Sequence, residues 1–140
     1  MQRPLSHFFA YVSRLRWIKR WGLMRNAIEE NVATHSWEVA TLAHALALIR
    51  NRYFGGTVNA DRIAAAALYH DATEVITGDL PTPVKYHSRV MREAFGDIEH
   101  KAEADLLALL PADLREDFAP YVRESLLSAE EKELSKAADR

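Results

Sequence analysis

Ala64-Ala65-Ala66-Ala67-Leu68-Tyr69-His70-Asp71 is the stretch on which the fold prediction rests. Its consecutive alanines favour a helix, and the imidazole and carboxylate that follow are adjacent metal-ligand types in a mostly apolar segment. A carboxylate in such a segment is costly unless it is paired or bound to a cation. His35 upstream and Asp139 downstream offer the same ligand types. If all four side chains meet, they form a nitrogen- and oxygen-donor site for a divalent metal ion.

Outward from this stretch, apolar residues recur at helical spacing, and glycines and prolines separate the segments. We expect helices to start at side chains that can cap a first turn, namely Ser6, Asn31 or Thr34, Asn59 or Asp61, and Ser128 with Glu131. The expected helices cover about 6–20, 31–53, 59–76, 84–110, 111–127 with a kink at Pro120, and 128–139. Because no alternating strand pattern of useful length occurs, the predicted fold class is all-α.

The composition is that of a globular chain of 140 residues, which is most simply one domain over 1–140. The absence of cysteine excludes disulfides, thiolate nucleophiles and cysteine-based metal sites. A formal net charge of −2 gives no general attraction to a nucleic-acid polymer. No apolar run approaches the roughly 20 residues of a membrane span, and the N-terminus lacks the apolar core of a signal peptide. We therefore expect a cytoplasmic protein with no membrane attachment.

Glu74 adds a second carboxylate close to His70 and Asp71. One continuous helix would place all three side chains on the same surface. A carboxylate beside a metal-bound water is well placed to transfer a proton, and four protein ligands would leave two octahedral positions for water and a substrate oxygen. Taken singly, each residue has a simpler interpretation, as a core or surface histidine or as a solvated helix carboxylate.

The order His35, His70-Asp71, Asp139 resembles the H…HD…D signature of the HD-domain phosphohydrolases. Further blocks are similar to the bacterial 5′-deoxynucleotidase branch of that superfamily, and the longest of them, a loop, is the most specific. These blocks are Ser6–Ala10, Ser13–Leu15, Arg20–Trp21, Leu23–Asn26, Glu30–Val32, His35–Ser36, Tyr69–Ala72, Glu74–Val75 and Thr77–Tyr86. Family members continue for several helices beyond the position of Asp139. The resemblance therefore implies an HD-domain helical bundle that lacks the C-terminal helices of the family.

The resemblance also implies an activity, the hydrolysis of deoxyribonucleoside 5′-monophosphates to deoxynucleoside and phosphate. One divalent metal ion, cobalt, manganese or another transition metal, would be the cofactor. Its ligands would be His35, His70, Asp71 and Asp139, of which His35, Asp71 and Asp139 would also face the substrate. Glu74 would act as general acid or base.

The same resemblance implies that two further segments bind the substrate. Arg20 would be a catalytic residue that orients the phosphate, because a guanidinium offers a forked set of donors, and Trp21 would pack on the sugar and exclude a 2′-hydroxyl. The far wall would be formed by Asp79, which accepts a hydrogen bond from the 3′-hydroxyl or binds a water near the metal, together with Leu80, Pro81 and Thr82.

Simpler interpretations of these residues stay open. Arg20 alone is typical of a solvated helix end, Trp21 of core packing, and Asp79 of a turn. The sequence assigns no role to Lys85, Arg25 or His7, and their default place is the surface.

Two alternative functions follow from the same residues. Another nucleotide phosphohydrolase or phosphodiesterase of the HD superfamily would share the ligand set, and a non-catalytic helical interaction domain would need no metal. As a 5′-deoxynucleotidase the chain would bind a small-molecule nucleotide, and the family resemblance suggests a homodimer.

Overall fold

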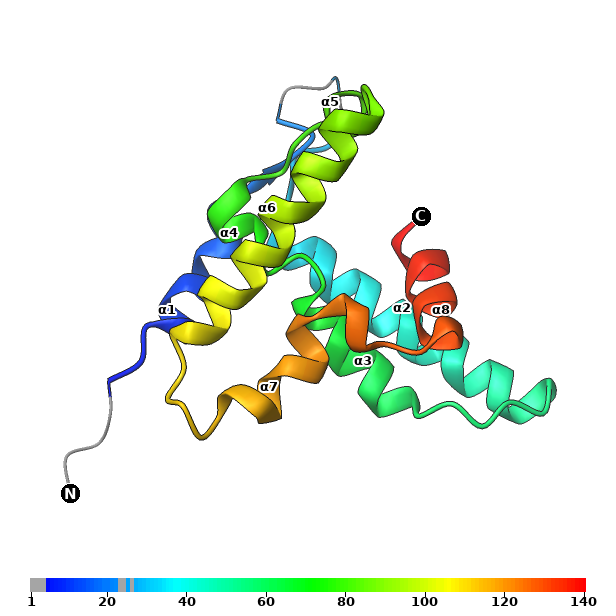
Figure 1. The fold of residues 1–140 in the computed structure, drawn as a ribbon. Coiled ribbons are helices and arrows are strands. Elements are labelled where there is room, and N and C mark those ends of the chain that lie inside the picture. The colour runs from blue at the N-terminus through cyan, green and yellow to red at the C-terminus, as the bar shows by residue number, and fades with distance from the viewer. Residues whose placement is uncertain (1–4, 23–24, 26) are drawn as a thin grey trace.

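A computed structural model describes residues 5–22, 25 and 27–140, and within these ranges the chain is mostly helical (Figure 1). The elements in chain order are α1 (Phe8–Ser13), η1 (Arg14–Trp17), β1 (Lys19–Arg20), β2 (Glu30–Asn31), α2 (Val32–Tyr53), α3 (Ala60–Tyr69), α4 (Glu74–Thr77), α5 (Thr82–Lys85), α6 (Arg89–Ala108), α7 (Arg115–Val122), η2 (Glu124–Leu126) and α8 (Ala129–Asp139). The predicted helical class is confirmed. β1 and β2 form one short antiparallel pair in which Lys19 faces Asn31.

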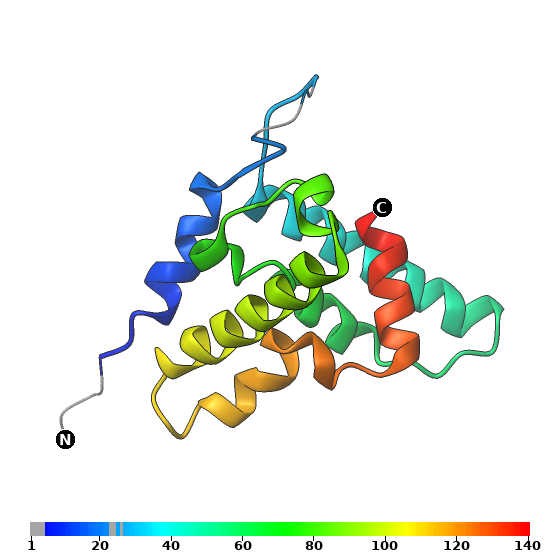
Figure 2. The same ribbon diagram turned by 45° about the horizontal axis from the view of Figure 1, so that its top comes forward.

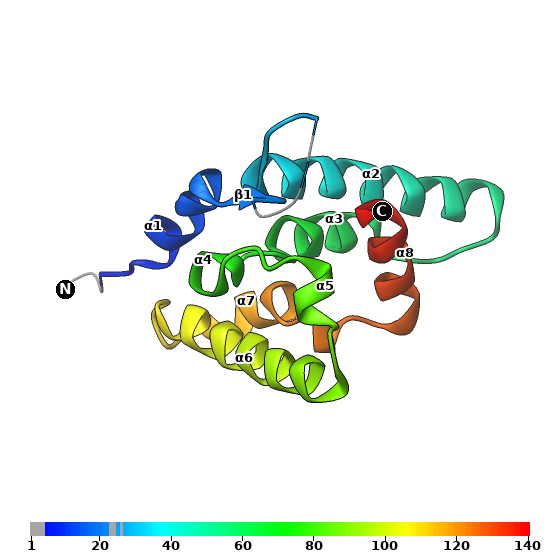
Figure 3. The ribbon, with the colours of Figure 1, turned by 90° about the horizontal axis from the view of Figure 1, so that it is seen from above.

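Helices α2 and α3 lie side by side, and α8 crosses them near the C-terminus (Figure 3). Small side chains let these helices approach closely: Ala43 and Ala47 of α2, Ala67 of α3 and Ala138 of α8 are buried together. Ala138 is the neighbour of Asp139 in the chain, so this packing brings the end of α8 against α2, which carries His35, and α3, which His70 follows. The described helices include none that is long and apolar enough to cross a membrane.

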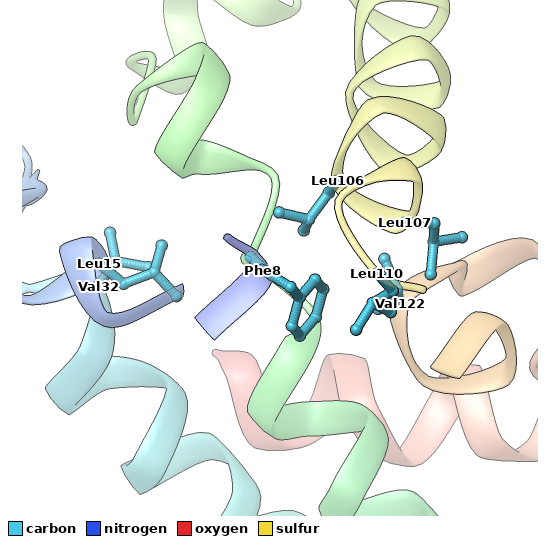
Figure 4. Close-up of a cluster of buried hydrophobic side chains, with 8 residues drawn as sticks. Phe8, Leu15, Val32, Leu106, Leu107, Leu110 and Val122 are labelled. Atoms are coloured by element: carbon cyan, nitrogen blue, oxygen red, sulfur yellow. The ribbon is translucent and has the colours of Figure 1, made fainter. Parts of the chain in front are cut away.

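A second core lies where α1, α6 and α7 meet, and Phe8 is at its centre (Figure 4). The Phe8 ring is fully buried and makes an edge-on contact with Phe118 at a centroid distance of 5.2 Å. Figure 2 shows the three helices gathered on the side of the molecule away from α8. This core also includes Val32, the first residue of α2, so it supports the helix that carries His35.

Phe8→Ala is expected to lower the free energy of unfolding by about 3–5 kcal/mol, because it leaves a cavity that neighbouring rings cannot fill. Chemical denaturation followed by circular dichroism measures the change. Phe9→Ala is the matched control, since Phe9 is 59% exposed, and should cost about 1 kcal/mol or less. Equal losses for the two variants would contradict the central place given to Phe8.

Three of the predicted caps are confirmed. Asn31 Oδ1 accepts a hydrogen bond from Thr34 N at 2.8 Å, so Asn31 and not Thr34 caps α2. The other two are Asn59, which accepts from Arg62 N at 3.1 Å, and Ser128, which accepts from Glu131 N at 3.1 Å. Ser6 does not occupy the predicted cap position, which His7 holds, but its Oγ accepts a hydrogen bond from Phe8 N at 3.3 Å and donates to the Leu109 carbonyl at 2.7 Å.

Several predicted helices are shorter than expected. The helix expected over 59–76 ends at Tyr69, and a turn over 70–73 separates it from α4. The helix expected over 84–110 begins at Arg89, because Ser88 caps it by accepting from Met91 N at 3.1 Å. Those expected over 6–20 and 111–127 become α1 with η1, and α7 with η2. These breaks place turns and short helices, rather than long helix faces, around the site.

Candidate metal centre and substrate cleft

His35, His70, Asp71 and Asp139 meet at one place in the structure. His35 is in the first turn of α2, His70 and Asp71 begin the turn after α3, and Asp139 is the last residue of α8. Each side chain offers one ligand atom, and these atoms all lie within 4.8 Å of one another. His35 Nε2 is 2.6 Å from Asp139 Oδ1. The predicted convergence of four distant residues is therefore present in the fold.

The hydrogen bonds of His70 orient its ring for a ligand. Nδ1 donates to the Ala67 carbonyl at 2.6 Å, so the neutral ring carries its lone pair on Nε2. Hydrogen bonds of this kind orient metal-binding histidines in proteins. Nε2 lies 3.0 Å from Asp71 Oδ2, yet it is buried and makes no hydrogen bond of acceptable geometry. A buried nitrogen without a partner, facing carboxylates, fits a divalent metal ion.

The electrostatics of the cluster also favour a cation. Burial opposes the charge of the His70 imidazolium, but the carboxylates of Asp139 and Asp71 raise the pKa of His70 to about 10. Burial alone would raise the pKa of Asp139, but its hydrogen bond to His35 and the nearby His70 imidazole hold that pKa well below its usual range. Both shifts have the same cause, the attraction between imidazoles and carboxylates that lie close together.

Glu74 is buried beside this cluster, at the start of α4. Its backbone N–H donates to the Asp71 carbonyl at 3.0 Å, and its Oε2 is buried without a hydrogen-bond partner. Burial, followed by the charges of Asp71 and Asp79, raises the pKa of Glu74 to about 8. The expected reason for its nearness, one continuous helix, is wrong: the turn over 70–73 brings Glu74 to the cleft.

A cleft of about 200 Å³ opens next to the four ligand candidates. It is lined by Arg20, Trp21, Asp71, Glu74, Asp79, Leu80, Pro81, Thr82, Lys85, Tyr86 and Asp139. The structure thus collects nearly all the predicted site residues around one space. The other two predicted residues line neighbouring cavities. His35 lines one together with Arg20 and Trp21, and His70 lines another together with Asp71.

The two predicted walls of the cleft are joined by a hydrogen bond. Trp21 N donates to Asp79 Oδ2 at 2.9 Å, although the residues are 58 positions apart. Trp21 has a φ of 59°, the one positive φ outside glycine in the described part of the chain. That backbone conformation is costly for a tryptophan, and the Asp79 carboxylate helps to hold it.

Arg20 is oriented by a partner that the sequence did not indicate. Its Nη1 donates to Glu30 Oε2 at 2.7 Å across the strand pair, and its guanidinium lies 5.6 Å from the centroid of the Trp21 ring. A two-residue strand pair has too weak a pattern to be predicted. Leu23, Met24 and Asn26, which also carry the family resemblance, lie outside the described residues.

The default surface place given to Lys85 is also wrong, because its side chain is only 20% exposed and lines the cleft. The available signal was its position inside the block Thr77–Tyr86, which carries the family resemblance and contains the expected cleft wall of Asp79 to Thr82.

Comparison with known proteins places the chain among close relatives. The family described as 5′-deoxynucleotidase YfbR-like matches residues 7–140. A 5′-deoxynucleotidase of Pasteurella multocida is 55% identical over 135 residues, which are 96% of this chain and 69% of that protein. The 5′-deoxynucleotidase YfbR of Escherichia coli K12 is 56% identical over 134 residues, 96% of this chain and 67% of that protein. The chain thus spans about two thirds of the length of these curated relatives.

Solved structures of HD-domain phosphohydrolases also match the chain. An HD-domain phosphohydrolase from Listeria innocua matches with a TM-score of 0.83 at 27% identity, over 95% of this chain and 63% of that one. The cyanophage S-2L HD phosphohydrolase DatZ, bound to dA and one catalytic Zn²⁺ ion, matches with a TM-score of 0.65 at 25% identity, over 99% of this chain and 68% of that one. The chain therefore belongs to the YfbR-like 5′-deoxynucleotidase family within the HD-domain phosphohydrolases.

Proposed function

We propose that this protein is a metal-dependent 5′-deoxynucleotidase, which hydrolyses deoxyribonucleoside 5′-monophosphates to deoxynucleoside and phosphate. The observation that carries the proposal is the His35, His70, Asp71 and Asp139 cluster at the edge of a cleft that also contains Glu74 and Arg20. Membership of the 5′-deoxynucleotidase family supports the substrate class. We also propose that 1–140 forms one HD domain.

The four clustered side chains are the proposed ligands of one divalent ion, and cobalt and manganese are the first candidates. DatZ, a structural relative, holds a catalytic Zn²⁺ ion, which is compatible with the same nitrogen and oxygen donors. When bound, such an ion lowers the pKa of water and polarises a phosphoryl oxygen. Phosphate-monoester hydrolysis is among the slowest uncatalysed reactions, so the contribution of the metal ion to the rate would be large.

Glu74 is the proposed proton-transfer group. Its carboxyl is buried beside Asp71 and has a pKa raised to about 8, near the pH at which a general acid or base is most effective. As a base it would accept a proton from the attacking water. As an acid it would protonate the leaving 5′ oxygen of the sugar.

Arg20 and Trp21 are proposed to hold the phosphate and the sugar. The guanidinium of Arg20 presents paired donors to phosphate oxygens and keeps its charge at any working pH. Trp21 is 39% exposed and lines the cleft, so its indole can form a wall against the sugar. A 2′-hydroxyl would collide with such a wall, which favours deoxyribose. Asp79, Leu80, Pro81 and Thr82 form the other wall.

An assay with two nucleotides tests the proposed function. Purified protein loaded with cobalt or manganese should release phosphate from dAMP, and release it much more slowly from AMP. Protein treated with a chelator and not reloaded is the control. Equal rates for dAMP and AMP would refute the deoxyribose preference. No release from either would refute the activity.

Trp21→Ala is expected to lower the ratio of kcat/KM for dAMP over AMP by about tenfold, because removing the indole makes room for the 2′-hydroxyl. Steady-state phosphate release with both substrates gives the ratio. Trp37→Ala, at an exposed position of α2, is the matched control and should leave the ratio unchanged. If the ratio also persists in Trp21→Ala, the indole does not discriminate between sugars.

A homodimer and a cytoplasmic location stay predictions. The preference for a small nucleotide over a nucleic-acid polymer belongs to the same proposal. It is supported by membership of the 5′-deoxynucleotidase family and by the formal net charge of −2, which gives no general attraction to a polymer.

A further inference from the structure

Lys85 lies between two cavities that meet at the metal centre. It is the last residue of α5, and it lines both the substrate cleft and a second cavity of about 250 Å³. Asp71 and Asp139 border both spaces as well. The proposed reaction gives a role to every other charged residue of the cleft, but none to this ammonium.

The contacts of Lys85 leave its donors available. Nζ lies 3.8 Å from Glu99 Oε1, which is too long for a hydrogen bond, and 4.7 Å from the centroid of the Phe95 ring. Over 5–22, 25 and 27–140, no residue accepts a hydrogen bond from this Nζ. An ammonium has three N–H donors, so all three can still be given to a ligand.

The cleft contains more carboxylates than cationic side chains, so a phosphate that binds there needs a second cationic side chain besides Arg20. Four carboxylates line it, those of Asp71, Glu74, Asp79 and Asp139, and a phosphate dianion that enters must be compensated. The cationic side chains among the described lining residues are Arg20 and Lys85, and Arg20 already donates to Glu30. Burial raises the pKa of Glu74 and the charge of Lys85 opposes that rise, so the field of the ammonium reaches into the cleft.

We propose that Lys85 is a further phosphate-binding residue of this site, whose ammonium turns from Glu99 to a phosphate oxygen when a phosphate group enters the cleft. The flexible four-carbon stem of lysine permits that movement. The nucleotide identity rests on the proposed function, whereas the binding of the phosphate group by Lys85 does not.

Calorimetric titration of metal-loaded protein with inorganic phosphate and, separately, with deoxyadenosine tests this proposal. Lys85→Met keeps a long apolar stem against Phe95 but removes the charge. We expect it to raise the Kd for phosphate by about tenfold or more, as the loss of one charge-assisted hydrogen bond predicts, and to change the response to deoxyadenosine by less than about twofold. Lys85→Arg should restore most of the phosphate affinity.

A matched control and the opposite outcomes make the test decisive. Lys101→Met removes an exposed ammonium that pairs with Asp105 on α6 and should change neither titration. Equal losses for phosphate and deoxyadenosine in Lys85→Met would mean that Lys85 only supports the wall, and would overturn the proposal. Unchanged phosphate affinity, or no phosphate binding by the wild type, would overturn it too. Failure of dAMP hydrolysis alone would refute the proposed function and leave these titrations to decide on Lys85.

Discussion

Asp71→Ala is expected to lower dAMP hydrolysis by about 1,000-fold or more and to leave the purified protein with little bound metal. Asp71 Oδ2 lies 3.0 Å from His70 Nε2 and 3.7 Å from His35 Nε2, so this carboxylate is shared by both imidazoles. Removing it takes away a proposed ligand and one of the two carboxylates of the cluster that attract the ion. Phosphate release and elemental analysis of metal per chain measure the two effects.

The thermal response to metal separates a lost ligand from a damaged fold. Metal that binds only the folded state raises the Tm of the wild type in proportion to its affinity, and Asp71→Ala should show little or no rise. Asp97→Ala, at an exposed position of α6, removes a carboxylate elsewhere and should behave as the wild type. Stoichiometric metal in Asp71→Ala, together with full activity, would show that Asp71 is not a ligand.

The meeting of His35, His70, Asp71 and Asp139 could be predicted from sequence because it depends on residue types in an order that resembles a family. The helix caps could also be predicted from sequence, because a cap depends on local chemistry. Asn31 and Ser128 act within one turn of their own positions, so their role needs no knowledge of the rest of the fold. This is why the start of the helix that carries His35 was predicted closely.

The interior of the site depends on contacts that no local pattern encodes. The turn over 70–73 contains neither glycine nor proline, and the hydrogen bond of His70 to Ala67 that accompanies it exists only once the fold has formed. The positive φ of Trp21 and its bond to Asp79 likewise join distant segments. Glu74 was therefore placed near the cluster for the wrong reason, and Lys85 was wrongly placed on the surface.

Glu74→Gln should lower kcat by about 100- to 10,000-fold, the usual contribution of a general acid or base, while metal content stays at the wild-type level. Glutamine has nearly the same shape but cannot exchange a proton near neutral pH. KM for dAMP should change by less than about threefold, because Glu74 is assigned to proton transfer and not to substrate binding. Steady-state kinetics with metal analysis on the same preparation provide the measurement.

The pH dependence of the wild type then tells which proton Glu74 moves. Burial and nearby carboxylates raise the pKa of Glu74 to about 8, and a bound cation would lower it from there. Activity that rises through this pKa indicates a base, and activity that falls indicates an acid. In Glu74→Gln that limb of the profile should disappear. Glu103→Gln is the matched control, since burial also raises the pKa of Glu103 outside the cleft, and it should keep both the rate and the limb. Full activity in Glu74→Gln would remove Glu74 from the chemistry and leave water to carry the proton.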